Sequence, residues 1–414
     1  MNDYIYRVDE RIFMLDCGRK YFTPEWIKRL IDEISAVGFN AINIHFADDM
    51  AFRLESKQYK WLSGGDHRLC GFGAKYGCPE NDGKYITQEE MKDIVLHARS
   101  RGVDVIPSLD SPGHMTYIVK TYKQNCGSDI GNYYHKNGKV ALVQAAGERE
   151  ESSFSLYSSC LDISNTEALS FITNLYTELG SFFRELGCKS FDIGGDELLG
   201  WGKGGIDTTV PKWCNLDHWK EYAQKATGNS EAVAYDAFIL YMNDIASLLH
   251  SLGYESVRMW NDDVYRASDT DWKEAAQIDT SIAIQYWSPH TNGGNNTAQF
   301  YIDRGHDIYN YSRLYNYYTL YPELKPSYVT PEAIMEEWNP YVFAPNNSSC
   351  DTHNNGYIFP PFKQGNIVEA PNEKVKGIGY CLWTDTPSAE TEDELLEHIR
   401  PYITAIAKKA TGNF

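Results

Sequence analysis

The chain has 414 residues, enough for one large domain or two ordinary ones, and its apolar content of 42% is typical of a soluble globular protein. Its formal net charge of −19 argues against nucleic acid and anionic membranes as partners, because their phosphates attract Lys and Arg. No run of about 18 apolar residues occurs, so no membrane span is predicted. The start, Met1-Asn2-Asp3-Tyr4, lacks an apolar signal segment.

The nine cysteines include no Cys-x-x-Cys pair, so the sequence predicts neither a zinc ribbon nor a thioredoxin-type site. Cys17, Cys188 and Cys381 lie in strand-like runs and are predicted to be buried thiols. Cys70 and Cys78 could bridge across one loop, while the odd count excludes complete pairing within one chain. No cluster of His and carboxylates with metal-ligand spacing stands out, so we expect no metal and no cofactor.

Helix-like and strand-like segments alternate almost from the first residues. The first helix begins at Thr23-Pro24 and ends at Gly38, and the second begins with the capping box Thr87-Gln88-Glu89-Glu90. A third is capped at Ser164-Asn165, and two more are expected at about 231–252 and 389–408. Apolar runs between them predict eight strands, at residues 12–17, 40–46, 103–109, 189–193, 256–260, 281–287, 307–311 and 375–383.

Eight strands separated by helices predict parallel β/α units, and eight such units closing on themselves form an α/β (β/α)8 TIM barrel. The long loops after strands two, three, four and seven follow the carboxyl ends, where barrel loops usually build a pocket. No linker, repeat or low-complexity tract divides the chain. Residues 1–414 are therefore predicted to be a single domain.

The run Lys-Ser-Phe-Asp-Ile-Gly-Gly-Asp-Glu at 189–197 lies at the centre of the predicted site. Gly194 and Gly195 allow a sharp turn and the close approach of a ligand. Asp196 and Glu197 follow at the carboxyl end of a strand, and two carboxyl groups in one cleft are pushed to different proton affinities. Acid-catalysed bond cleavage needs such a pair. The alternative interpretation is a surface pair that caps the next helix.

Polar and aromatic side chains also gather at the other strand ends. Taken singly, each has a structural explanation, such as a core tryptophan or an arginine paired with a surface acid. Together they suit a neutral, hydroxyl-rich ligand held by bidentate hydrogen bonds and stacking. In strand order they are Arg19; Asp48, Asp49 and Arg53; Asp110 and His114; Trp260, Asn261 and Asp262; Tyr286 and Trp287; Tyr311, Tyr315, Tyr317 and Tyr318; and Trp383 and Asp385.

Six sequence blocks in order resemble the catalytic domain of glycoside hydrolase family 20, the β-N-acetylhexosaminidases and lacto-N-biosidases. The resemblance runs from about residue 11 to about residue 400. The blocks are Leu-Asp-Cys-Gly-Arg-Lys-Tyr-Phe at 15–22, Ile-His-Phe-Ala-Asp-Asp at 44–49, Ile-Pro-Ser-Leu-Asp-Ser-Pro-Gly-His at 106–114, Asp-Ile-Gly-Gly-Asp-Glu at 192–197, Met-Trp-Asn-Asp at 259–262 and Leu-Trp-Thr-Asp at 382–385.

This resemblance implies a retaining, exo-acting β-N-acetylhexosaminidase that removes terminal β-linked N-acetylhexosamine from an oligosaccharide or glycoconjugate. Glu197 would be the general acid and then the general base. Asp196 would hold the substrate's 2-acetamido group, whose carbonyl oxygen would serve as the nucleophile and give an oxazolinium intermediate. Asp110 and His114 would form a relay behind Glu197.

The same resemblance implies a substrate-binding set. Arg19 would bind ring hydroxyls, with Asp48 and Asp385 as further polar contacts. A tyrosine after strand seven would donate to the acetamide oxygen; Tyr317 is favoured, and Tyr315 is the alternative on the same strand face. The walls of the acetamide pocket would be Trp260, Trp287 and Trp383.

Three departures from the family pattern concern contacts to sugar hydroxyls. Met-Ala-Phe-Arg at 50–53 stands where Gln-Gly-Trp-Arg is common, Asn-Tyr-Tyr-Thr at 316–319 lacks the Asp of Tyr-Leu-Asp, and Asp385 replaces a Glu. They look closer to the bacterial secreted branch, which predicts a secreted or cell-surface protein, although the sequence itself leaves the compartment open.

Three alternatives remain open beside the exo-hexosaminidase. They are a lacto-N-biosidase that releases a disaccharide, a non-catalytic glycan-binding barrel, and a barrel hydrolase that cleaves plain glucosides with a protein nucleophile. The sequence also leaves open the preferred hexosamine, the linkage and the oligomeric state.

Overall fold

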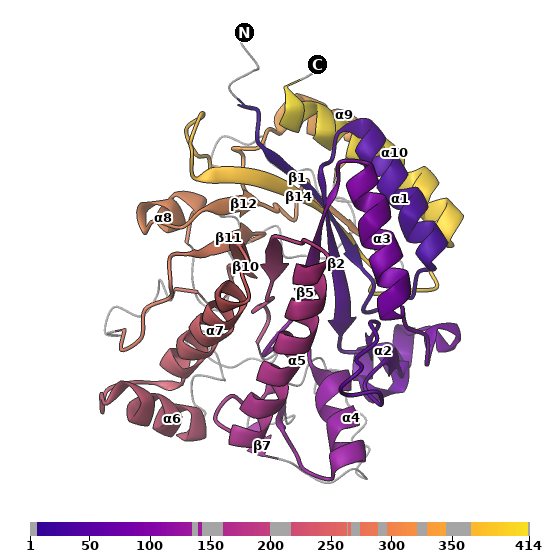
Figure 1. Ribbon diagram of the computed structural model, residues 1–414. Helices are drawn as coiled ribbons and strands as arrows, with labels where there is room; N and C mark the ends of the chain where they lie inside the picture. The colour runs from indigo at the N-terminus through magenta and orange to yellow at the C-terminus, as the bar shows by residue number, and fades with distance from the viewer. Residues whose placement is uncertain are drawn as a thin grey trace.

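The computed structural model describes residues 6–134, 140–142, 160–198, 217–262, 264–265, 274–288, 296–320, 329–344 and 366–412. Eight parallel strands close into a barrel, in which the first strand pairs with both the second and the last (Figure 1). This confirms the (β/α)8 fold. The strands are β1 (Glu10–Asp16), β2 (Ala41–Asp48), β5 (Asp104–Leu109), β9 (Ser190–Asp192), β10 (Ser256–Trp260), β11 (Ile282–Tyr286), β12 (Ile308–Asn310) and β14 (Val375–Trp383).

The five predicted helices are present around the barrel. Thr23 caps the first through its side chain, which accepts from the Trp26 amide, and Thr87 forms the predicted capping box with Glu90. The first, second and last of them pack side by side on one flank (Figure 1). These helices are α1 (Pro24–Val37), α3 (Gln88–Ser100), α5 (Thr166–Glu185), α7 (Ala234–Ser251) and α10 (Glu392–Thr411).

Short elements within the connecting segments were not predicted. One helix follows strand six and another follows strand seven. The remaining elements lie in the segments at the carboxyl ends of strands two, three, four and seven. These elements are β3 (Ala51–Phe52), β4 (Gly64–Gly65), α2 (Gly71–Tyr76), α4 (Thr116–Cys126), β6 (Gly131–Tyr134), β7 (Val140–Leu142), β8 (Cys160–Leu161), α6 (Asp217–Thr227), α8 (Ala298–Asp303), β13 (Tyr317–Thr319) and α9 (Pro331–Glu337).

Two hydrophobic clusters hold the barrel together. The larger lies between the sheet and the helices and takes the outward strand residues. The smaller lies inside the barrel, where Trp260, Tyr311 and Tyr317 join aliphatic residues from the strands, and Trp287 and Trp383 pack against it while remaining partly exposed. The inner cluster therefore ends in aromatic rings at the carboxyl ends of the strands, where the predicted site lies.

The structure settles the cysteine predictions for the part of the chain that it describes. Cys17, Cys188 and Cys381 are buried free thiols, as predicted. The suggested bridge between Cys70 and Cys78 is wrong, because both thiols are free and the Cys70 Sγ accepts from the Gly73 amide at 3.0 Å, where it caps α2. Among the described residues, no helix is long and apolar enough to cross a membrane.

Candidate active site

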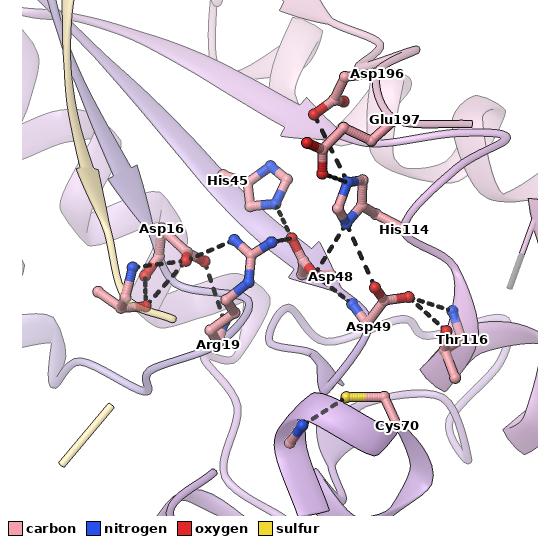
Figure 2. A network of polar contacts seen from close by, with 12 residues as sticks. Asp16, Arg19, His45, Asp48, Asp49, Cys70, His114, Thr116, Asp196 and Glu197 are labelled. Atoms are coloured by element: carbon pink, nitrogen blue, oxygen red, sulfur yellow. Dashed lines mark hydrogen bonds and ion pairs between the residues drawn. The ribbon is translucent and has the colours of Figure 1, made fainter. Parts of the chain in front are cut away.

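The backbone after β9 carries Asp196 and Glu197 into the site through two left-handed glycines. Gly194 and Gly195 have φ of +68° and +86°, and a Cβ at Gly194 would lie 1.9 Å from the Asp110 Oδ1. Only glycine fits that position. Glu197 itself has φ of +42°, an uncommon value for a residue with a side chain, and such strain concentrates at functional sites. Asp196 and Glu197 both lie beside His114 (Figure 2).

His114 links the acidic pair to the end of β2. Its Nε2 lies 3.3 Å from the Glu197 Oε2 and 3.7 Å from the Asp196 Oδ2, while its Nδ1 lies 3.4 Å from oxygens of both Asp48 and Asp49 (Figure 2). Burial lowers the pKa of His114, but the charge of Asp48 and the hydrogen bonds that the ring donates to the surrounding carboxylates outweigh it and place the pKa well above its usual value. His114 is therefore an imidazolium beside Glu197 at neutral pH.

The carboxylates that face the Nδ1 of His114 differ from the one expected from the sequence. Asp48 and Asp49, not Asp110, face the Nδ1 of His114. An oxygen of Asp110 lies within 4.8 Å of a His114 ring nitrogen and of an Asp196 oxygen, and its Oδ1 accepts from the Gly195 amide at 2.9 Å. The loop after β5 that carries His114 closes over the end of β2, where the Thr116 amide donates to the Asp49 Oδ1 at 3.0 Å, and sequence spacing does not show how a loop closes.

Arg19 is held between two carboxylates. Its Nη1 lies 3.0 Å from the Asp16 Oδ2 and its Nη2 lies 3.0 Å from the Asp48 Oδ2, which His45 also contacts at 3.0 Å (Figure 2). Burial lowers the pKa of Arg19, but Asp48 and Asp16 outweigh it and the net pKa is well above the usual value. Its guanidinium is thus a fixed, charged donor, and it lies 5.4 Å from the Trp383 ring.

Asp48 acts within this network rather than as an exposed sugar ligand. It is only 1% exposed, and its two oxygens contact Arg19, His45, His114 and the Asp49 amide. Burial raises its pKa, but Arg19 and His114 outweigh that contribution and hold the net pKa well below the usual value. In this structure the oxygens of Asp48 are engaged by protein groups, and its predicted contact with substrate stays a prediction.

Asp16 is a site residue that the sequence reasoning missed. It is fully buried and accepts from the Arg19 amide at 3.1 Å and from the amide and hydroxyl of Thr384 at 3.0 Å each, in addition to its contact with the Arg19 guanidinium. It therefore ties the end of β1 to the segment after β14. The available signal was an Asp at the end of an otherwise apolar strand run, three residues before Arg19.

An aromatic wall adjoins the charged groups, since the Trp383 ring lies beside Arg19 and His45. The Trp287 and Tyr317 rings are nearly parallel at 12° with centroids 6.4 Å apart, and Trp383 lies 6.0 Å from Tyr317 and 6.1 Å from Trp260. The Trp287 indole donates to the Asp262 Oδ2 at 2.6 Å, which fixes the orientation of the ring. The structure thus brings the three predicted tryptophans together with Tyr317.

Tyr315 does not belong to this wall. Its hydroxyl donates to the Glu337 Oε2 at 3.3 Å, and its ring packs in the outer cluster near Trp338. Alternation within a strand does not relate it to Tyr317, because Tyr315 lies in the turn before β13. Of the two alternatives, only Tyr317 lies with the other predicted site residues.

Two further polar residues have different placements. Asp385 lies near Arg19, and burial raises its pKa to about 6, with Arg19 opposing the shift and Asp16 and Asp48 adding to it. Arg53 is turned away into the loop after β2, where its Nη1 donates to the carbonyls of Asn81 and Lys84. Asp385 therefore stays with the predicted site, and Arg53 has a structural role.

Several groups of acidic and histidine side chains lie close enough together to be considered as metal ligands. In each, the candidate atoms are within 4.8 Å of one another, but they contact protein donors such as Arg19, Thr116, the Gly195 amide and Arg68. We therefore assign no metal to them. These groups are Asp16, His45 and Asp48; Asp48, Asp49 and His114; Asp110, His114 and Asp196; and Asp66, His67 and Asp82.

Comparison with known proteins gives concordant matches. The family described as "Glycosyl hydrolase family 20, catalytic domain" matches residues 9–410. The chain is 24% identical over 315 residues to a lacto-N-biosidase of Bifidobacterium bifidum, which covers 76% of this chain and 22% of that protein. It is 25% identical over 299 residues to β-hexosaminidase subunit A2 of Dictyostelium discoideum, which covers 71% and 45% respectively.

Among solved structures, a tandem catalytic module of the pneumococcal exo-β-D-N-acetylglucosaminidase superposes with a TM-score of 0.68 at 22% identity. The match covers 100% of this chain and 86% of that one, and it supports the barrel fold. The chain spans less than half the length of the two curated relatives described above.

Proposed function

We propose, on the premise that this chain belongs to glycosyl hydrolase family 20, that it is a retaining, exo-acting β-N-acetylhexosaminidase. One observation carries the proposal. The Oδ1 of Asp196 is buried and lacks a hydrogen-bond partner among the described residues, while the adjacent Glu197 is 32% exposed. A buried oxygen without a donor is costly, and an amide N–H of a substrate would supply that donor.

The first chemical step follows from this arrangement. Glu197 donates its proton to the glycosidic oxygen as the bond from that oxygen to the anomeric carbon breaks. The carbonyl oxygen of the acetamide forms a bond to the anomeric carbon, and Asp196 accepts a hydrogen bond from the acetamide N–H as positive charge develops there. His114, an imidazolium 3.3 Å from Glu197, stabilises the carboxylate that Glu197 becomes.

The second step regenerates the site. Glu197 takes a proton from water, the water oxygen bonds to the anomeric carbon, and the acetamide oxygen leaves, so the configuration is retained. A protein nucleophile would require a second carboxyl group about 5 Å away across the sugar ring. Asp196 and Glu197 instead leave the same strand end, which suits one group acting on the leaving oxygen and the other on a neighbouring amide.

The proposal is tested with a panel of aryl β-glycosides of N-acetylglucosamine, N-acetylgalactosamine, lacto-N-biose and glucose. We expect turnover of the N-acetylhexosaminides, and loss of about 10²–10⁴ in kcat for Glu197→Gln. Glu89→Gln is the matched control, because Glu89 is exposed and its one ion pair among the described residues is with exposed Lys92. Equal turnover of the plain glucoside, or an active Glu197→Gln variant, would overturn the proposal.

A second candidate is favoured by one comparison. The match to the lacto-N-biosidase covers 76% of this chain, which makes release of a disaccharide the natural alternative. Both activities would use the same acetamide chemistry and would bind a thiazoline mimic of the intermediate. Release of the disaccharide from the aryl lacto-N-bioside, compared with release of N-acetylglucosamine from its aryl glycoside, distinguishes the two activities. Glycan binding without turnover at any pH would favour a non-catalytic barrel.

A further inference from the structure

Asp110 and Asp196 form a contact between two carboxyl groups that the reaction described above does not use. Asp110 follows β5 and is 2% exposed; the side chain of Asp196 follows β9 and is 14% exposed. An oxygen of Asp110 and an oxygen of Asp196 lie within 4.8 Å of each other and of a His114 ring nitrogen, and the two carboxyl groups are in hydrogen-bonding contact. Asp110 cannot turn away, because the Gly195 amide donates to its Oδ1 at 2.9 Å and the backbone of Gly194 packs against it.

A hydrogen bond between two carboxyl groups needs a proton, since an ionised carboxylate has acceptors only. The surroundings show which group holds that proton. Asp196 lies 3.7 Å from the imidazolium of His114, which favours its ionised form, whereas Asp110 is more deeply buried. One oxygen of Asp110 already accepts from the Gly195 amide, which leaves its other oxygen to carry the proton.

We propose that Asp110 is held as a neutral carboxylic acid that donates a hydrogen bond to Asp196, and so acts as a positioning residue for Asp196. This inference rests on the proposed function, because it concerns the group that would hold the acetamide. The donated bond fixes the orientation of the Asp196 carboxylate, which keeps further acceptor lone pairs for the substrate N–H. In support, burial and then the charge of Asp196 raise the pKa of Asp110 well above its usual value.

Other titratable groups surround the pair. His114 and the hydroxyls of Tyr176 on α5 and Tyr241 on α7 act on Asp110 or lie near it, and Glu197 and His45 act on Asp196. Burial raises the pKa of both tyrosines, and the net pKa of His114 is raised as well, so these three groups keep their protonated forms at neutral pH. A proton lost from Asp110 would place two anions in contact.

Two substitutions distinguish a neutral Asp110 from an ionised one. Asp110→Asn keeps an acceptor for the Gly195 amide and a donor for Asp196, but it cannot ionise. Asp110→Leu has the same branched shape, is larger, and offers neither an acceptor nor a donor. We expect Asp110→Asn to keep kcat within about tenfold of the wild type, and Asp110→Leu to lose at least about a hundredfold, because Asp196 is misplaced. Equal losses in the two variants would overturn the proposal.

Thermal stability against pH gives a readout that needs no activity. A carboxyl group whose folded pKa is raised binds its proton more tightly in the folded state, so it lowers stability as pH rises above the unfolded value of about 4. The Tm of Asp110→Asn minus that of the wild type should therefore increase from pH 5 to pH 9. A difference that is flat or decreases with pH would show that Asp110 is ionised, and would overturn the proposal.

Asp196→Asn provides a second test if the leucine variant does not fold. This substitution removes the anion that Asp110 faces. The Tm of the double variant Asp110→Asn/Asp196→Asn minus that of Asp196→Asn should therefore increase less with pH than the difference measured in the wild type. An equally large increase would contradict the pairing of Asp110 with Asp196. The outcomes also separate the two proposals. A wild type without turnover whose Tm difference rises as expected would reject the hydrolase and keep the neutral Asp110. An active wild type whose Tm difference does not change with pH would keep the hydrolase and reject the neutral Asp110.

Discussion

Replacing Asp16 by asparagine tests whether the buried clamp on Arg19 holds the site together. The carboxylate of Asp16 is fully buried and receives four donors, two from Arg19 and two from Thr384. An asparagine has a single acceptor oxygen. Its NH2 group would face N–H or O–H donors of Arg19 or Thr384, and neither side could accept. Breaking one arm of a buried ion pair costs about 3 kcal/mol at the lower end of the measured range.

The expected shift in Tm follows from the chain length. At about 2.1 cal/mol/K per residue, the unfolding entropy of 414 residues is about 0.9 kcal/mol/K, so 3 kcal/mol lowers Tm by about 3 °C. Arg19 keeps its contact with Asp48, so its guanidinium should remain in place but less firmly oriented. We expect KM for the aryl N-acetylhexosaminide to rise about tenfold, equivalent to about 1.4 kcal/mol of binding, with a smaller change in kcat.

The assay combines calorimetry at one scan rate with initial rates over a range of substrate concentrations. Thr384→Val is the matched control, because it removes one hydroxyl donor to Asp16 and leaves the Arg19 ion pair intact, and it should cost about 1 kcal/mol without raising KM. If Asp16→Asn left both Tm and KM at wild-type values, Asp16 would not be the anchor of Arg19. A fall in kcat with unchanged KM would point to a different role for Arg19.

Two other changes test the substrate side of the site. Since burial raises the pKa of Asp385 to about 6, its ionised form should be lost below that pH; KM of the wild type should then rise from pH 7 to pH 5, whereas Asp385→Asn should show a high KM that does not change over this range. A wild-type KM independent of pH would exclude Asp385 as an acceptor for a sugar hydroxyl. Tyr317→Phe should lower kcat about a hundredfold, if the hydroxyl stabilises the attacking acetamide oxygen. Tyr315→Phe, which loses a bond to Glu337 outside the aromatic wall, should cost about 1 kcal/mol of stability with a much smaller effect on kcat, and equal kinetic losses would reject the assignment of Tyr317.

The barrel could be predicted because its signals are local. Each barrel strand is a short apolar run, and most helix starts carry a capping residue, so the eight strands and five helices were found within a few residues. The last helix was placed three residues early because its capping box, Thr391 with Glu394, was not recognised. Of the missed helices, α2, α8 and α9 have six or seven residues and carry little periodicity, whereas α4 and α6 have 11 residues each and their length does not explain the miss.

The site was predicted in part, and its internal pairing was not. Strand ends predicted which side chains meet, but not which atoms face each other. The bonds of Asp16 to Thr384 join residues 368 positions apart, and the contacts of His114 with Asp48 and Asp49 depend on how a loop closes over a neighbouring strand. Tyr315 was paired with Tyr317 on the assumption of strand alternation, which a turn does not obey.

The tight passage at Gly194 has a consequence for laboratory evolution of this protein. Any side chain at Gly194 would overlap the Asp110 carboxyl group, so a single substitution there is not tolerated. A change at Gly194 would require a simultaneous change at Asp110. Libraries aimed at new glycan preferences are therefore better directed at Asp385 and at the tryptophans of the aromatic wall, with Tyr317 and the backbone at residues 194–197 kept.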